Sequence, residues 1–82
     1  MEFPSNLLND LNDAYANYNR ISIIKYMNRD KSDEEILKLL VEDGLTDVRH
    51  GYPEYYNTMK REIANYLYKR NVELLKNYNP SR

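Results

Sequence analysis

The only imidazole in the sequence lies near two carboxylates, the one arrangement in the chain that could support metal binding or acid–base chemistry. Asp47, His50 and Glu54 fall within a stretch of eight residues. Zinc sites built from such ligands usually use two or three imidazoles, and the chain has a single His. Pro53 also interrupts the helical spacing that would align His50 with Glu54. The pattern therefore predicts a structural loop histidine and no metal site.

The other groups that enzymes use are missing or isolated. The chain has no Cys, and two Gly, Gly44 and Gly51, are too few for a phosphate-binding loop. No Ser has His and Asp partners in a triad pattern, and no carboxylate pair lies in apolar sequence that would separate two pKa values. We therefore expect no enzymatic activity and no cofactor.

The aromatic side chains favour a different chemistry, the recognition of another protein. The chain has nine Tyr, one Phe and no Trp. Tyr and Arg are enriched at interface hot spots, and the core of so small a domain cannot absorb every ring. A cluster of these residue types precedes and begins the last predicted helix, where it would complement an acidic or mixed partner surface. The candidate partner-binding residues are Arg49, His50, Tyr52, Tyr55 and Tyr56.

The composition also bears on the kind of protein. Tyr, Asn, Ile and Lys are encoded by A/T-rich triplets, so their abundance is typical of a low-GC bacterium or its phage. Small helical chains of this type, without Cys, are common among phage and mobile-element products. We interpret the chain as an interaction module that binds and inhibits or redirects a host protein.

The distribution of charge keeps nucleic-acid binding open as the alternative. The net charge is -1, but residues 46–82 carry seven basic and four acidic groups, and residues 1–45 carry five and nine. A basic face is the electrostatic footprint of a nucleic-acid-binding protein. A helix ending at Gly44 has the general form of the first half of a helix-turn-helix, although the sequence after it disfavours a recognition helix. The candidate nucleic-acid contacts are Lys60, Arg61, Lys69 and Arg70.

The elements that must position these residues are helices. Apolar residues recur at three- and four-residue spacing, and the three prolines separate such segments. This predicts an all-α fold, a small bundle of about four helices with a long C-terminal helix, in a single domain over residues 1–82. The expected helices span 6–18, 20–28, 33–43 and 53–77. Residues 20–28 could also form a strand, because Ile favours β structure.

The third helix has the clearest boundaries. Ser32 and Glu35 fit a capping box, and three acidic residues in the first turn complement the helix dipole. Gly44 is expected to end this helix in a left-handed cap, with Leu45 folding back onto Leu40. The expected core consists of Leu8, Leu11, Tyr15, Ile24, Ile36, Leu40, Met59, Ile63 and Leu67.

The last helix is longer than the bundle it belongs to. A helix of 25 residues is about 37 Å long, against a diameter of about 25 Å for a compact domain of this size. Its distal half is expected to overhang, unless the helix bends near Arg70 and Asn71. A second copy of the chain could cover the exposed apolar side chains in a homodimer. The candidate dimer residues are Tyr68, Val72, Leu75 and Tyr78.

Cellular location follows from what the sequence does not contain. The apolar runs are far shorter than the ~20 residues needed to cross a bilayer, and the first residues are unlike a signal peptide. We expect a cytoplasmic protein that makes no membrane contact.

Overall fold

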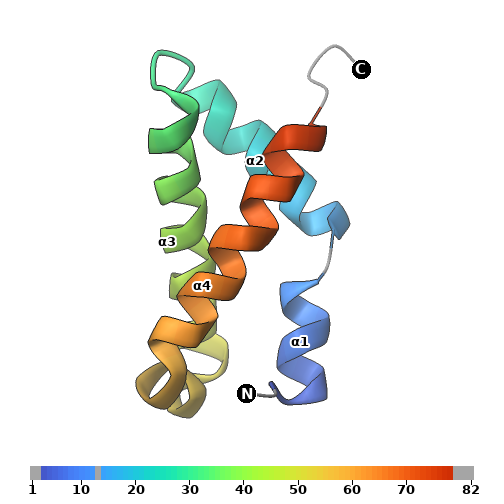
Figure 1. Ribbon diagram of the computed structural model, residues 1–82, viewed down its shortest axis with the longest axis vertical. Helices are drawn as coiled ribbons and strands as arrows, with labels where there is room; N and C mark the ends of the chain where they lie inside the picture. The colour runs from blue at the N-terminus through green and yellow to red at the C-terminus, as the bar shows by residue number, and fades with distance from the viewer. Residues whose placement is uncertain (1–2, 13, 79–82) are drawn as a thin grey trace.

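The described residues form a bundle of four helices with no strand. The computed structural model describes residues 3–12 and 14–78. The helices are α1 (Ser5–Leu11), α2 (Ala14–Met27), α3 (Asp33–Gly51) and α4 (Pro53–Asn77). In Figure 1, α3 and α4 lie side by side along the long axis, with α2 near one end and α1 near the other. The all-α fold and the long C-terminal helix are confirmed, and residues 20–27 are helical and not a strand.

The two long helices form a hairpin with a single residue between them. The Ser32 side chain accepts a hydrogen bond from the Glu35 backbone N–H at 3.2 Å, so the predicted start of α3 is correct. Pro53 occupies the first turn of α4, where a missing N–H has no cost. Only Tyr52 separates the two helices, which makes them antiparallel neighbours.

The predicted end of α3 at residue 43 is wrong. Gly44 does not have a positive φ, and the helix continues to Gly51. A Cβ on Gly44 would lie 2.9 Å from Leu67 Cδ1, so the absent side chain allows α3 and α4 to approach closely. The continuation places Val48 in the core and packs Leu45 against it, which explains why helix is favoured over a cap.

The boundary between the first two helices also differs from the expected one. α1 ends at Leu11 and not at residue 18, and α2 begins at Ala14 and not at residue 20. Asn12, with φ -96° and ψ 5°, forms the C-cap of α1. With this earlier break, Tyr18, Ile21 and Ile24 share one face of α2 at three-residue spacing, which lets that face pack on the bundle.

The core has two clusters, one at each end of the bundle. The first contains Leu7, Leu11, Val48, Met59, Ile63 and Leu67. The second contains Ile21, Ile36, Leu40 and Leu74. Most of the expected core residues are buried, whereas Leu8 and Ile24 are half-buried, and the side chain of Tyr15 lies outside the described residues. The expected core omitted Leu7, Ile21 and Val48, which are at most 3% exposed.

One face of the distal half of α4 is covered within the chain. The molecule measures 37 × 20 × 19 Å, so α4 spans nearly its whole length. Leu75 and Tyr78 pack with Ile21 and Tyr18 of α2, so the expectation that they would be uncovered is wrong. Val72, on another face of α4, is 37% exposed as expected. Asn71 donates to the Leu67 carbonyl at 2.8 Å, and the non-helical backbone in α4 is at Met59, not near Arg70 and Asn71.

Candidate functional site

The residues expected to bind a partner gather where α3 meets α4, but their exposure differs. Arg49 and His50 are exposed, and Tyr55 is 37% exposed. Within the described residues, the side chains of Arg49 and His50 form no hydrogen bond or ion pair. Tyr52 and Tyr56 are half-buried and pack against the core. The structure thus leaves part of the expected set available and uses the rest for folding.

A surface groove lies between α3 and α4 at this corner. Its volume is about 280 Å³, and we call it the α3–α4 groove. The residues that line it are Glu42, Leu45, Thr46, Arg49, Tyr56 and Lys60. Lys60 Nζ lies 5.5 Å from the centre of the Tyr56 ring, within the range of a cation–π contact. Two cations, one carboxylate and an aromatic ring therefore border a partly apolar groove.

Tyr52 ties this corner to α1. Its hydroxyl donates a hydrogen bond to the Asp10 carboxylate at 2.5 Å. This hydrogen bond, with a smaller contribution from desolvation, raises the pKa of Tyr52 above its ordinary value. Like any Tyr hydroxyl, it is a donor at neutral pH, and here its hydrogen bond joins the α3–α4 corner to α1.

The possible metal ligands do not form a centre. Asp47 binds Arg20, whereas His50 and Glu54 are exposed. No group of three or more His, Cys, Asp or Glu side chains in residues 3–12 and 14–78 is placed to hold a metal ion. His50 lies in the last turn of α3 and not in a loop, so that part of the prediction is wrong.

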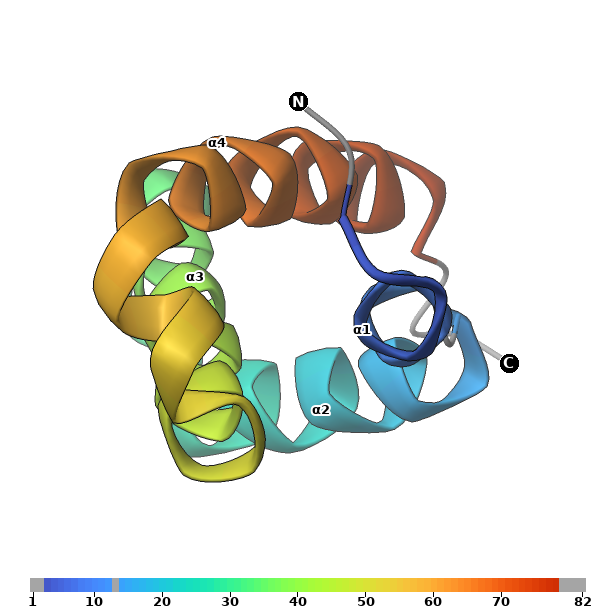
Figure 2. The same ribbon diagram turned by 90° about the horizontal axis from the view of Figure 1, so that it is seen from below.

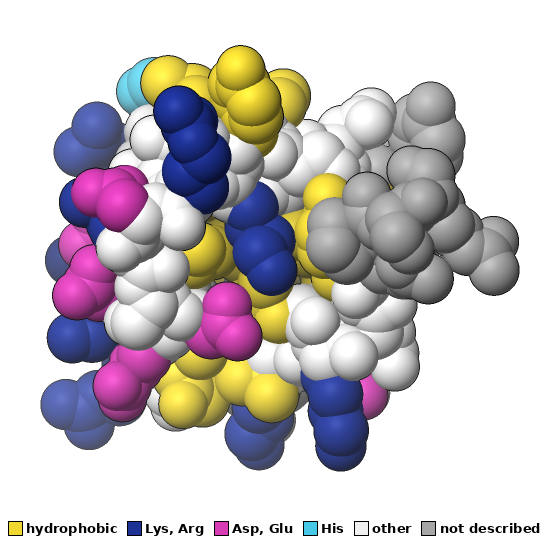
Figure 3. All heavy atoms as spheres, turned by 90° about the horizontal axis from the view of Figure 1, so that it is seen from above, with side chains coloured by type: hydrophobic (Ala, Val, Ile, Leu, Met, Phe, Trp, Pro, Cys, Tyr) yellow, Lys and Arg dark blue, Asp and Glu magenta, His cyan; other side chains and the backbone are white. Residues whose placement is uncertain are grey.

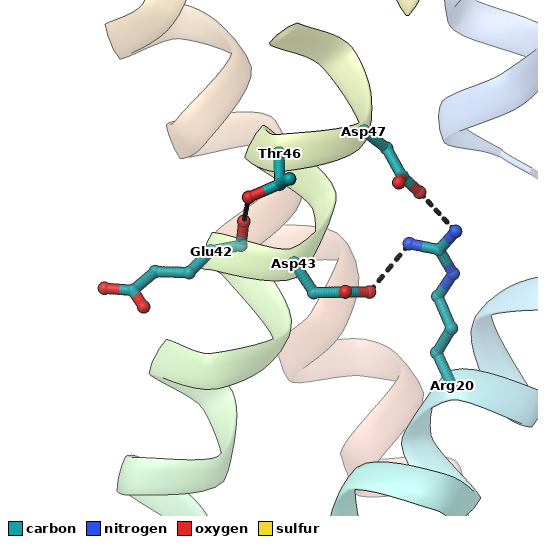
Figure 4. A network of polar contacts seen from close by, with 5 residues as sticks. All are labelled: Arg20, Glu42, Asp43, Thr46 and Asp47. Carbon is teal, nitrogen blue, oxygen red and sulfur yellow. Dashed lines mark hydrogen bonds and ion pairs between the residues drawn. The ribbon is translucent and has the colours of Figure 1, made fainter. Parts of the chain in front are cut away.

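An ion-pair network joins α2 to α3 (Figure 4). Arg20 reaches across to Asp43, with a distance of 2.7 Å between nitrogen and oxygen, and to Asp47. Partial burial lowers the pKa of Arg20, but the two carboxylates outweigh it and raise that pKa overall. Because all three side chains are at least 40% exposed, the network contributes only modestly to stability. In the sequence, this network is indicated only by the four-residue spacing of Asp43 and Asp47, which places both carboxylates on one face of α3.

A cavity of about 280 Å³ lies beside this network, bounded by all four helices. Its apolar walls include Leu7, Leu11, Val48 and Leu67, and its polar residues are Asp10, Arg20, Asp47 and Tyr52. Both glycines of the chain also line it. A side chain at Gly51 would meet nothing within 4 Å, so this part of the wall is open.

The four residues expected to contact nucleic acid do not act as one set. Lys60, Arg61 and Lys69 are exposed. Arg70 is half-buried, and its guanidinium donates to the Leu11 and Asn12 carbonyls at 3.1 and 2.9 Å. It satisfies carbonyl groups that the end of α1 leaves without helical partners. The continuation of α3 through Gly44 also removes the turn that a helix-turn-helix requires there.

The expected dimer face is smaller than the sequence indicates. Tyr68 is 55% exposed and Val72 is 37% exposed. Leu75 and Tyr78 pack against α2, and the Tyr78 ring stacks on Tyr18 with 6.5 Å between ring centres. The exposed part of the expected dimer face therefore consists of two of its four residues.

The most exposed large apolar side chains lie on α2 and were not among the expected sites. Ile23 is 58% exposed, Tyr26 73% and Met27 71%, and we call these three residues the α2 stripe. Figure 3 looks onto the end with the α2–α3 turn, where hydrophobic side chains reach the surface close to Lys and Arg. The sequence signal was the density of apolar residues in 21–27, which exceeds what one helix face can bury.

Comparison with known proteins identifies no relative. The chain matches no protein-family model, no curated protein and no solved structure at a significant level. Among the described residues, the helices are either too short or too polar to pass through a bilayer.

Proposed function

We propose that the chain is a non-enzymatic module that binds another protein at the corner between α3 and α4. The observation that carries this proposal is the α3–α4 groove, where Arg49 and Lys60 border the Tyr56 ring. Aromatic and Arg side chains in a concave site are the usual anchors of protein interfaces.

The charges of the groove favour a particular partner. Two cations against the single carboxylate of Glu42 would complement an acidic side chain, while Leu45 and Tyr56 offer apolar contact beside it. Tyr55 and His50 would extend the contact beyond the groove, since both are exposed, in the first turn of α4 and the last turn of α3. The expected occupant is an acidic or mixed segment of a protein surface.

The proposal includes a biological role. Binding at this corner would cover a working surface of the partner and so inhibit or redirect it without chemistry. The small size, the absence of Cys and the abundance of residues encoded by A/T-rich triplets support a phage or mobile-element protein that acts on a host protein in the cytoplasm.

The experiment is affinity capture from cells that contain the protein, followed by mass spectrometry. The informative variant is Arg49→Ala with Tyr55→Ala, because the half-buried Tyr52 and Tyr56 also support the fold. Arg61→Ala is the matched control, since Arg61 is exposed on α4 and lies outside the groove. We expect a partner that wild type and control enrich equally and that the double variant loses about tenfold or more.

The capture experiment can also contradict the proposed binding site. Equal capture by the double variant, with unchanged helicity and melting temperature, would remove this corner from the interface.

A gel-shift assay with duplex DNA addresses the alternative function, nucleic-acid binding. Retardation at low salt that requires Lys60, Arg61 and Lys69, and weakens steeply as salt rises, would favour nucleic-acid binding instead.

A further inference from the structure

The cavity beside the Arg20 network has no part in the function proposed above. All four helices, which form a ring in Figure 2, contribute residues to its wall. It shares no lining residue with the α3–α4 groove. Its volume of about 280 Å³ is nearly twice the roughly 150 Å³ that holds a benzene molecule in a protein interior. The cavity is therefore large enough for a small organic molecule.

The cavity has an apolar floor and one open side. Leu11, Val48 and Leu67 line it and are at most 6% exposed, so they lie at its base. The half-buried ring of Tyr52 is also part of the wall. The wall is open at Gly51, since a Cβ there would meet nothing within 4 Å. A molecule with an apolar body could enter beside Gly51 and pack on the Tyr52 ring and the floor.

The charges around the cavity favour a cation as the occupant. Among the described residues, the charged groups in its wall are Asp10, Arg20 and Asp47. Arg20 already contacts two carboxylates, those of Asp43 and Asp47. Arg70 does not line the cavity, and its guanidinium donates to carbonyls at the end of α1. Even with Arg70 counted, three carboxylates stand against two cations, and this excess of negative charge attracts a cation.

Both carboxylates in the wall can accept further hydrogen bonds. Asp10 accepts one from the Tyr52 hydroxyl, and Asp47 contacts Arg20, whereas a carboxylate has about four acceptor positions. An ammonium group supplies donors for these positions and is attracted to the face of an aromatic ring such as that of Tyr52. An anion would have to draw Arg20 away from the two carboxylates that hold it (Figure 4).

We propose that this cavity binds a small organic amine, with its apolar body against Tyr52 and the floor and its ammonium group beside Asp10 and Asp47. The molecule would contact α1 through Asp10 and Leu11, and α3 and α4 through Val48 and Leu67. It would therefore bind only while α1 is packed on the other helices, and its binding would hold the short first helix in place.

The probe is tryptamine, whose fluorescence is distinct from that of the protein because the chain has no Trp. Tryptophol and indole-3-propionate are its neutral and anionic analogues. We expect tryptamine to bind the full chain with a Kd of about 1 mM or below. Tryptophol should bind about tenfold more weakly, and indole-3-propionate more weakly still. In NMR spectra, tryptamine should shift the methyl resonances of Leu11, Val48 and Leu67.

Substitution of the two carboxylates tests the role of charge. Asp10→Asn with Asp47→Asn should remove most of the preference for tryptamine over tryptophol and leave the affinity for tryptophol unchanged. Asp30→Asn is the matched control, because Asp30 is exposed and lies outside the cavity, and the preference should stay as in the wild type. Arg49→Ala with Tyr55→Ala should not affect tryptamine, so failure here is distinct from failure of the proposed function.

Two measurements on the wild type require no substitution. With tryptamine at ten times its Kd, the amides of α1 should exchange with solvent about tenfold more slowly. Unchanged exchange of these amides would overturn the proposal, as would indole-3-propionate binding as tightly as tryptamine. It is also wrong if tryptamine does not bind at several times the expected Kd, if the shifted methyl groups lie elsewhere, or if the folded double Asn variant keeps the full preference for tryptamine.

Discussion

Single side chains that reach across the bundle decide how its weakest element is held. α1 has seven residues, too few for a stable helix in isolation. Arg70 and Tyr52 each join it to the rest of the chain through a hydrogen bond from their side chains. A basic residue that the sequence associates with nucleic acid is thus a structural contact, because its partners are carbonyls far away in the sequence.

Removal of the Arg70 guanidinium should destabilise the fold. Arg70→Met keeps much of the aliphatic stem but loses the hydrogen bonds to the Leu11 and Asn12 carbonyls. We expect the free energy of unfolding to fall by about 1 kcal/mol, measured by urea denaturation. Lys69→Met is the control, since Lys69 is exposed next in sequence, and it should change stability by less than about 0.5 kcal/mol. Equal effects of the two substitutions would contradict a structural role for the Arg70 hydrogen bonds at the end of α1.

The Tyr52 hydrogen bond predicts a pH dependence at the alkaline end. Its partner Asp10 raises the pKa of Tyr52 above the ordinary value of 10.0, so the folded state holds this proton more tightly than the unfolded state. The stabilisation is therefore complete below about pH 10 and is lost as pH rises through the folded pKa. Unfolding by urea at several pH values should show a stability advantage over Tyr52→Phe that shrinks above about pH 10.

The same measurement on Tyr55→Phe gives the control. Within the described residues the Tyr55 hydroxyl forms no hydrogen bond, so its removal should leave the pH dependence unchanged. A difference between wild type and Tyr52→Phe that stays constant to high pH would argue against the Asp10 contact.

At the scale of the helix, the two glycines of α3 should respond differently to the same substitution. Gly44→Ala and Gly51→Ala both gain helix propensity, and neither position has a positive φ. Only the Cβ at Gly44 would meet Leu67, at 2.9 Å. We expect Gly51→Ala to raise the free energy of unfolding by up to about 1 kcal/mol. In Gly44→Ala, overpacking against Leu67 should cancel this gain and lower the free energy of unfolding by about 1 kcal/mol below that of the wild type. Thermal unfolding of both variants tests this, and equal gains would show that Leu67 moves aside freely.

How far the sequence predicts the structure also varies by element. The limits of α4 are correct because Pro53 permits only a start there, and no Gly or Pro follows until Pro80. The end of α3 is missed because Gly44 is compatible with both a cap and a close helix contact, and only Leu67, distant in sequence, decides between them. The α1–α2 break is missed because several Asn residues are equally plausible breakpoints.

The candidate site is predictable to a smaller extent. Residue type identifies the corner of Arg49 and Tyr55, but it does not show that Tyr52 and Tyr56 pack against the core. The α2 stripe is missed because α2 is apolar on two faces, and the sequence does not show which face meets α3 and α4. Burial depends on the arrangement of all four helices, which local patterns do not contain.

Across the whole molecule, the helices depend on one another unequally. α3 and α4 are adjacent in sequence and contribute residues to both core clusters. In Figure 2, which views the bundle from below, α1 lies across the ring of helices from α3. The core residues of α1 are Leu7 and Leu11, and side-chain hydrogen bonds at its C-terminal end supply much of the remaining attachment. The free energy of local opening is therefore lower for α1 than for the α3–α4 hairpin.

We therefore expect the native state to open locally to a partly unfolded form in which α1 has detached and the α3–α4 hairpin remains. In native-state hydrogen exchange, the amides of α1 should exchange together, with a lower free energy and a smaller urea dependence than the core amides, because release of α1 exposes less surface than global unfolding does. The amides around Val48 and Ile63 should exchange only on global unfolding. Detachment of α1 would uncover Val48 and Leu67 to solvent, so this minor state would be the species most prone to aggregate.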